Sequence, residues 1–405
     1  MTTALSLLRS PATIRARCAN ITAAAEAGAS RWFVVHPERL ADAATRVAAV
    51  TRQRYPDLRI PYHSRWRHFE AGGVDRNAEL AGLLVGQDRA EQARARIDLA
   101  VVSVLLDAGA GPQWRYVETN AAPPYARSEG LGVASFRAFV AGRFSSDPAQ
   151  PLRVDGAALA RLDAATLAEL FQVRADNPLV GLDGRAQLLQ RLGAAMAAQP
   201  AAFGTNARPG GLFDLLSDNG RLDHLPAAAL LRGLLDHTSS IWLTGSTFEG
   251  QPLGDAWRHP AAGGDGETAG WVPFHKLSQW LVYSLLEPFE WAGITITERD
   301  ALTALPEYRN GGLLLDAGVL TLRDPTHAAR IWQPSDELVI EWRALTITLI
   351  DRLAERVRTL LGLNAEALPL ACVLEGGTWA TGRVLAAELR GGLPPLTIDS
   401  DGTVF

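Results

Sequence analysis

DELVIEWRALTITLIDRLAERVRTL, residues 336–360, carries the longest helical pattern of apolar residues in the sequence. One stripe recurs every three or four residues, which is the period of an α-helix, and consists of Val339, Trp342, Thr346, Leu349, Leu353 and Val357. Further apolar residues such as Leu338, Ile340 and Leu345 surround this stripe in the first turns. Because a helix that is apolar on nearly every side belongs in a core, the segment predicts a long central helix.

Four further segments predict helices. Residues 37–52 place apolar side chains near a 3.6-residue period. Residues 77–107 are rich in Ala, Leu, Glu and Arg, and they end at the glycine- and proline-containing breaker 109–112. The other two helices are expected after Gly184 and over residues 274–289.

Strand signals are few and short. They cover residues 32–35, 313–322 and 368–374. No internal repeat or low-complexity tract accompanies them. The pattern therefore predicts a mainly α fold, or α+β with small β pieces.

Length and composition indicate a globular protein with a large core. The 405 residues are 47% hydrophobic and 20% charged, which is ordinary for a folded chain and long enough for two domains. Turn-forming residues near 143–156 favour a boundary there. We expect an N-terminal helical lobe over 1–150 and a C-terminal lobe over 151–405 that carries most of the site, or else one continuous unit.

Charge and cysteine content narrow the class of protein. A net charge of −5 argues against a general nucleic-acid binder, which would show a basic surface. Cys18 and Cys372 are the only cysteines, which favours a reducing compartment. The first 17 residues lack the apolar run of a signal peptide or a membrane span. These features predict a cytoplasmic protein with a small-molecule ligand, and they leave the oligomeric state open.

Glu341 and Arg343 interrupt the start of the apolar helix. Two residues correspond to about 200° of rotation, so the two side chains cannot pair with each other. Each needs its own partner, because an unpaired buried charge is costly. The partners are either other charges of the protein or a polar ligand.

The segment LPEYRNGGLLLDAGVL, residues 305–320, groups polar residues between apolar flanks. Glu307 is either part of an N-capping turn or a catalytic carboxylate, with Arg309 or Asn310 orienting a substrate. Asp316 follows in an apolar run and again requires a partner.

Basic residues form two candidate anion sites. Lys276 stands at the expected start of a helix, where a phosphate is favoured, although a solvated first turn is the simpler reading. His63, Arg65, His68 and neighbouring arginines surround Trp66, which suits either an anion site or a basic surface loop.

The motifs of several enzyme classes are absent from the sequence. LEGGTWATGR, residues 374–383, could hold an anion in a glycine-rich turn, but it lacks P-loop spacing. No metal-binding H-E-x-x-H or C-x-x-C motif and no serine-hydrolase G-x-S-x-G motif occurs. We therefore predict neither a metal nor a cofactor. Catalysis by carboxylate side chains is the remaining candidate.

Seven segments together resemble the uracil-catabolism family, whose fungal members are encoded by the Urc/Urg uracil-utilisation genes. They are RSEGLGVASF (127–136), FQVRADNPLVGLDGR (171–185), VPFHKLSQWLVYSLLEPFEWAG (272–293), LPEYRNGGLLLDAGVL (305–320), VIEWRALTITLIDRLAERVR (339–358), LEGGTWATGR (374–383) and SDGTVF (400–405). The resemblance spans about residues 20–405. It implies a pathway that opens the pyrimidine ring of a uracil nucleotide and passes through a ribosylurea-type intermediate.

A second, more distant resemblance is to queuosine-salvage nucleotide glycosidases, which have a helical core similar to that of DNA glycosylases. Their F-x-K, D-Y-R and E-x-R motifs match Phe274–Lys276, Glu307–Arg309 and Glu341–Arg343 in the same order. This chain departs by having Glu307 in place of an Asp and Ser284 in place of a second Asp.

Together the resemblances imply an N-glycosidase that hydrolyses a ribosylurea, free or 5′-phosphorylated, to urea and ribose or ribose phosphate. The expected catalytic carboxylates are Glu307, Asp316 and Glu341. The expected substrate-binding residues are His63, Arg65, His68, Lys276, Tyr308, Arg309 and Arg343. The alternatives are a ureido or amide hydrolase acting on the opened ring and a non-catalytic ligand-binding protein of the same pathway.

Overall fold

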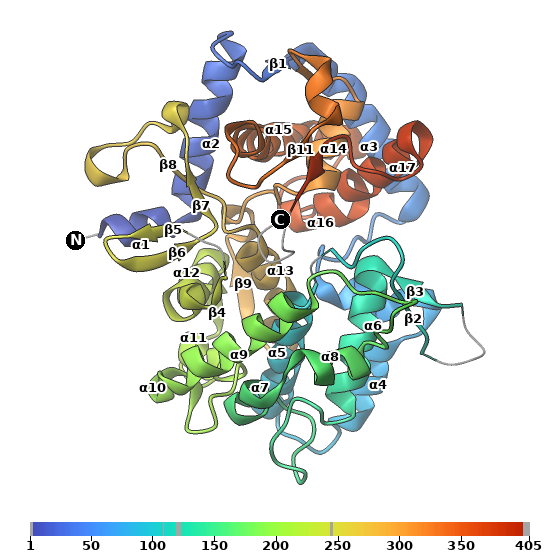
Figure 1. The fold of residues 1–405 in the computed structure, drawn as a ribbon, viewed down its shortest axis with the longest axis vertical. Helices are drawn as coiled ribbons and strands as arrows, with labels where there is room; N and C mark the ends of the chain where they lie inside the picture. Colours follow the sequence, from blue (N-terminus) through green and yellow to red (C-terminus); the bar gives the residue numbers. More distant parts are fainter. Residues whose placement is uncertain (1–2, 108, 119–122, 244–245, 400–405) are drawn as a thin grey trace. The chain divides into compact units, whose positions relative to one another are not determined.

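The structure is a computed structural model that describes residues 3–107, 109–118, 123–243 and 246–399. Within these residues it contains seventeen α-helices and twelve strands of two to four residues, which pair two by two (Figure 1). The predicted mainly α fold is confirmed, while the glycosidase-like core stays a prediction. No helix in the described part of the chain combines the length and the apolar character needed to cross a bilayer. The SDGTVF segment lies outside the described residues.

The chain forms two compact units that interleave in sequence. Of the described residues, 3–63, 246–279 and 298–399 form unit 1, and 64–107, 109–118, 123–243 and 280–297 form unit 2. The division into lobes 1–150 and 151–405 stays a prediction.

The predicted central helix is α15 (Glu337–Leu361), which belongs to unit 1. It packs against α2 (Pro11–Glu26), α3 (Leu40–Arg54) and α14 (Tyr308–Asp316) (Figure 1). Nearly all of its first two turns is buried, including both charged residues flanking Trp342. The prediction of a core helix is therefore confirmed.

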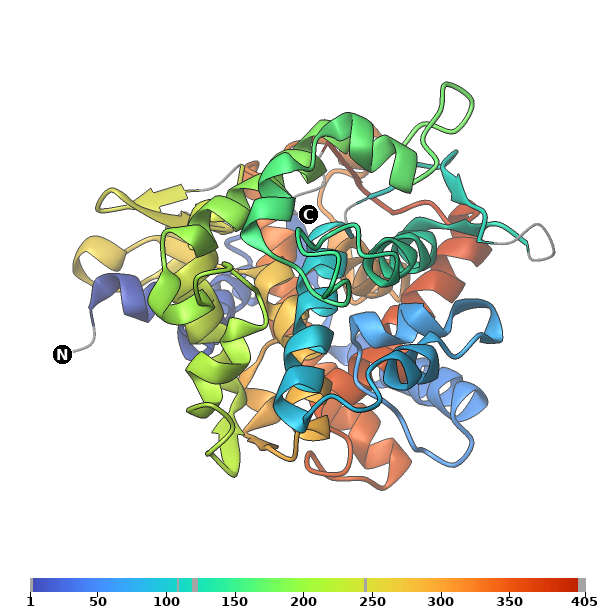
Figure 2. The same ribbon diagram turned by 90° about the horizontal axis from the view of Figure 1, so that it is seen from below.

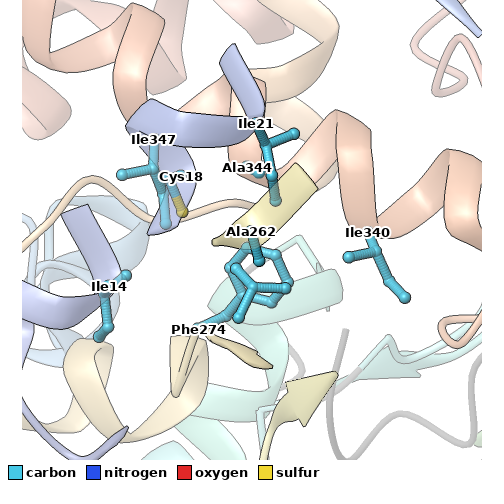
Figure 3. Close-up of a cluster of buried hydrophobic side chains, with 9 residues drawn as sticks. Ile14, Cys18, Ile21, Ala262, Phe274, Ile340, Ala344 and Ile347 are labelled. Carbon is cyan, nitrogen blue, oxygen red and sulfur yellow. The ribbon is translucent and has the colours of Figure 1, made fainter. Parts of the chain in front are cut away.

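One face of α2 meets α15 through an apolar cluster (Figure 3). Ile14, Cys18 and Ile21, which are spaced by four and three residues, pack against α15 and against Phe274. Burial raises the pKa of the Cys18 thiol, so this cysteine acts as a small apolar residue.

The predicted strand at 368–374 is wrong. Its residues form α16 (Leu370–Val373), which continues through a π-helical turn, η8 (Leu374–Thr378), into α17 (Trp379–Arg390). A short buried apolar run has no period that separates strand from helix. A side chain at Gly377 would meet Val47 of α3 at 2.4 Å, so this turn needs a glycine for close packing.

Two other predicted elements are shorter than expected. The 313–322 strand is reduced to β10 (Leu320–Leu322), antiparallel to β1 (Phe33–Val35), because α14 extends to Asp316. The 77–107 helix is divided into α4 (Arg76–Leu83) and α5 (Arg89–Leu105). Gly86 has a φ of 90° between them, and Asp88 caps α5.

The remaining elements of unit 1 are α1 (Ala4–Leu8), β5 (Ser246–Phe248), β6 (Gln251–Gly254), β7 (Ala256–Arg258), β8 (Trp271–Pro273), β11 (Ile331–Trp332) and β12 (Thr397–Ile398). Helix α13 (Lys276–Trp291) begins in unit 1 and ends in unit 2.

In unit 2, α5 packs against α6 (Arg127–Val140) and α9 (Leu182–Ala197), and α9 also contacts α12 (Ala227–Thr238) (Figure 2). The other elements of this unit are η2 (Arg65–Gly73), η3 (Ser239–Ile241), α7 (Gly156–Arg161), α8 (Ala164–Leu170), α10 (Pro200–Phe203), α11 (Gly211–Ser217), β2 (Arg115–Tyr116), β3 (Tyr125–Ala126), β4 (His224–Pro226) and β9 (Thr295–Thr297).

Candidate active site

Glu307 is the N-cap of α14. Its two carboxylate oxygens accept hydrogen bonds from the backbone N–H groups of Arg309 and Asn310, each at 2.6 Å. Burial raises the pKa of Glu307, while these two hydrogen bonds and the charges of Lys276 and His63 lower it, and the net shift is upward. The carboxylate is thus held in one orientation, and Lys276 and His63 lower its pKa against the effect of burial.

Lys276 is the first residue of α13 and is half-buried. The residue before it, His275, has a φ of 47°, a left-handed conformation that is uncommon outside glycine and concentrates at functional sites. The N–H groups of Phe274 and His275 donate to the Asp255 carbonyl, and that of Lys276 donates to the Asp255 carboxylate at 3.0 Å. Because Asp255 occupies this helix N-terminus, an anion here would meet the lysine side chain instead.

Lys276 is also the only lysine of the sequence, since every other member of its 39 Lys and Arg residues is an arginine. Lysine presents a compact ammonium that can exchange a proton, whereas arginine stays charged. A single lysine in a sequence otherwise restricted to arginine singles out this position.

His63 forms a buried pair with Glu375 of the π-helical turn. Its Nδ1 lies 2.9 Å from a Glu375 oxygen, and the other oxygen accepts from Arg54 at 2.9 Å and from Tyr55 at 3.2 Å. Burial favours a higher pKa for Glu375, but the hydrogen bond and charge of His63, and then those of Arg54, lower it to about 2. The ionised Glu375 therefore orients the imidazole of His63.

Two buried oxygen atoms on the same turns make no hydrogen bond within the described residues. They are Oδ1 of Asn310, in the first turn of α14, and Oγ1 of Thr378, at the end of η8. Buried polar atoms without a protein partner call for water or a ligand. π-Helical turns are likewise frequent at functional sites.

The other expected site residues of unit 1 lie in protein contacts. Asp316 forms a two-pronged ion pair with Arg390 at 2.7 and 2.6 Å. Arg343 binds Asp255 in the same way at 2.8 and 2.6 Å, and its guanidinium lies over Phe274.

Arg309 donates to the Gly392 carbonyl at 3.2 Å, and its guanidinium lies over the ring of the exposed Tyr308. Glu341 contacts Ser30 and His259. Glu341 and Arg343 do not pair with each other, as their spacing predicted.

Arg65 and His68 belong to unit 2. Arg65 is fully buried and donates to Ser103 at 2.6 Å, with Asp107 at 3.2 Å. His68 is buried, and its ring packs edge-on against Trp280.

Sequence reasoning did not select Glu375, Arg54 or Asp255. The LEGGT segment was singled out, but its glycines suggested an anion-binding loop and its glutamate was overlooked. Asp255 stands in a loop-like stretch, and no local sequence pattern predicts that it pairs with Arg343 of α15. Within the described residues no group of three or more His, Cys, Asp or Glu side chains is placed to hold a metal.

The whole chain matches known sequences. The sequence model of a family described as "Protein of unknown function (DUF1688)" matches residues 7–405. The chain belongs to this family. It is 40% identical over 401 residues to "Protein urg3" of Schizosaccharomyces pombe, covering 97% of this chain and 96% of that protein. It is 41% identical over 377 residues to "Uracil catabolism protein 4" of Lachancea kluyveri, covering 85% of each. The resemblance to the uracil-catabolism family is thereby confirmed.

Proposed function

We propose that this protein is an enzyme of uracil catabolism that hydrolyses the N-glycosidic bond of a ribosylurea, free or 5′-phosphorylated, to urea and ribose or ribose phosphate. The names of its two relatives support the pathway. The observation that carries the reaction class is the carboxylate of Glu307, whose orientation is fixed by two N–H groups and whose pKa responds to Lys276 and His63.

Cleavage of an N-glycoside develops positive charge on the sugar ring at C1. A carboxylate beside that carbon stabilises the charge, and an acid assists the departing nitrogen. In this proposal Glu307 faces C1 and His63 transfers the proton. The C1–N bond breaks, and the hydroxyl of a water molecule adds to C1. The remaining proton of that water is transferred to the departing nitrogen, which becomes an NH₂ group of urea.

Lys276 and His63 also suit a phosphate or the sugar hydroxyls, since both can donate hydrogen bonds. Asp316 is left out of the proposed reaction because Arg390 neutralises its carboxylate. Glu341 is left out because its carboxylate lines a pocket to which Glu307, Lys276 and His63 do not contribute. Cys18 and Cys372 are buried thiols without a disulfide, which is consistent with a cytoplasmic location for the reaction.

The test is to incubate the purified protein with ribosylurea and with its 5′-phosphate, and to measure urea and reducing sugar. Stoichiometric release of both supports the proposal, and the better substrate defines the phosphorylation state. Ammonia or a carboxylic acid in place of urea would identify a ureido or amide hydrolase. Binding without turnover would identify a ligand-binding protein.

A further inference from the structure

Unit 1 contains a pocket of about 520 Å³. Its walls come from the end of α2, from the turn at residues 259–261 and from the start of α15. Ile21, Ala25 and Ala261 make part of the lining apolar, and Ile21 also belongs to the cluster between α2 and α15 (Figure 3). A volume of this size accommodates a small organic molecule.

The buried polar group of this pocket is Glu341. Its side chain is only 4% exposed, and one carboxylate oxygen accepts a hydrogen bond from the Ser30 hydroxyl. The other oxygen lies 3.5 Å from Nε2 of His259, whose side chain is equally buried. That ring nitrogen makes no hydrogen bond in the part of the chain that the structure describes.

No arginine or lysine within the described residues forms an ion pair with Glu341. Arg31, the arginine of the pocket lining, pairs with Glu337 at 3.1 Å, and its own side chain is 66% exposed. Asp351, further along α15, pairs with Arg15 at 2.9 Å. Buried carboxylates normally receive a cation or several hydrogen bonds, and Glu341 has one hydroxyl and one distant ring nitrogen.

We propose that this pocket binds a small organic cation, an ammonium or guanidinium group on a short apolar stem. The cationic head would donate to Glu341 and take the place of the missing ion-pair partner. The alanine and isoleucine side chains would cover the stem. This site is separate from the group around Glu307 and does not depend on the proposed glycosidase reaction.

The test is calorimetric titration of the full-length protein with n-butylguanidinium and with its neutral counterpart n-butylurea. We expect saturable binding of the cation, at least tenfold tighter than binding of the urea. Glu341→Gln should weaken cation binding at least tenfold. Glu355→Gln, a matched change on the exposed face of the same helix, should leave it unchanged.

Two further variants keep the result interpretable. Ser30→Ala removes the hydroxyl but keeps the Glu341 carboxylate, so it should preserve n-butylguanidinium binding within a few-fold. This variant still tests the pocket if Glu341→Gln does not fold. Glu307→Gln should not alter binding, which separates this proposal from the proposed function. Equal affinity for the cation and the urea, an unaffected Glu341→Gln variant, or no binding of n-butylguanidinium would each overturn the proposal.

Discussion

The pair of Asp255 with Arg343 and the group around Glu307 both place a carboxylate in the interior of unit 1, but they neutralise it differently. Asp255 receives two hydrogen bonds from one guanidinium, a third from the Lys276 N–H and a fourth from Trp257. Glu307 receives two backbone N–H groups and only the more distant influence of Lys276 and His63.

The pKa values follow this difference. Although burial alone would raise it, the pKa of Asp255 is lowered by Arg343 and by the Lys276 and Trp257 hydrogen bonds. The pKa of Glu307 is raised because burial outweighs its partners. We therefore expect Asp255 to support the fold, and Glu307 is the carboxylate to which we assign the chemistry.

The largest expected effect is on turnover in Glu307→Gln. Loss of the charged carboxylate should lower kcat by about 10²- to 10⁴-fold, the usual range for a positioned acid–base group. The loss of the N-cap charge should lower the free energy of unfolding by only about 1 kcal/mol. Urea release and thermal unfolding measure the two quantities, with Glu355→Gln as the matched control. A Glu307→Gln variant that does not fold, or one that keeps full activity, would show that Glu307 does not serve chemistry rather than stability.

Arg343→Met should show the opposite pattern. It leaves Asp255 buried without its cation, so the free energy of unfolding should fall by about 3–5 kcal/mol. Chemical denaturation measures this change. Arg356→Met on the exposed side of the same helix serves as the control and should stay within about 0.5 kcal/mol of the wild type. A stable Arg343→Met protein would show that the ion pair is not structural.

Lys276→Arg tests whether the site needs a lysine or only a positive charge. We expect kcat/KM to fall by about tenfold or more, because a planar guanidinium cannot replace a compact ammonium that exchanges protons. The hydrogen bond from the Lys276 N–H to Asp255 is a backbone contact and should be kept in this variant. Arg356→Lys is the reverse exchange at an exposed position and should leave both quantities unchanged. Full activity in Lys276→Arg would show that the site needs only a positive charge at this position and not a lysine.

The last prediction concerns the pH dependence of stability and Glu287 in unit 2. Burial raises its pKa to about 7, although Arg67 and Ser64 act against the shift. In the pH range from about 4.5 to 7 the folded protein holds a proton there that the unfolded chain has released. This contribution to stability is therefore present below pH 4.5 and lost as the pH rises through 7. Glu287→Gln should flatten that part of the stability–pH curve, and an unchanged slope would contradict it.

Much of the helical framework could be predicted from the sequence. The central helix, the helices near 37–52, 184 and 274–289, and the impossibility of a Glu341–Arg343 pair all follow from local spacing. The strand expected at 368–374 and the unbroken helix over 77–107 were wrong. The first is a short apolar run without a diagnostic period, and the second conceals a break at Gly86.

The site was only partly predictable. Glu307 and Lys276 were singled out from residue type and from their places at expected helix starts, and His63 was singled out from its basic surroundings. Glu375 was not selected, because its importance depends on a π-helical turn that brings it to His63, 312 residues away in sequence.

The sequence by itself determined where helices form, which of them is buried, and which charged residues would require partners, because periodicity and spacing act over a few residues. Only the tertiary structure decided which partner each charge received. Asp255 is 88 residues from Arg343, and Ser30 is 311 residues from Glu341. Ion pairs and hydrogen bonds depend on distance in space, and no local pattern records which distant segments the core brings together.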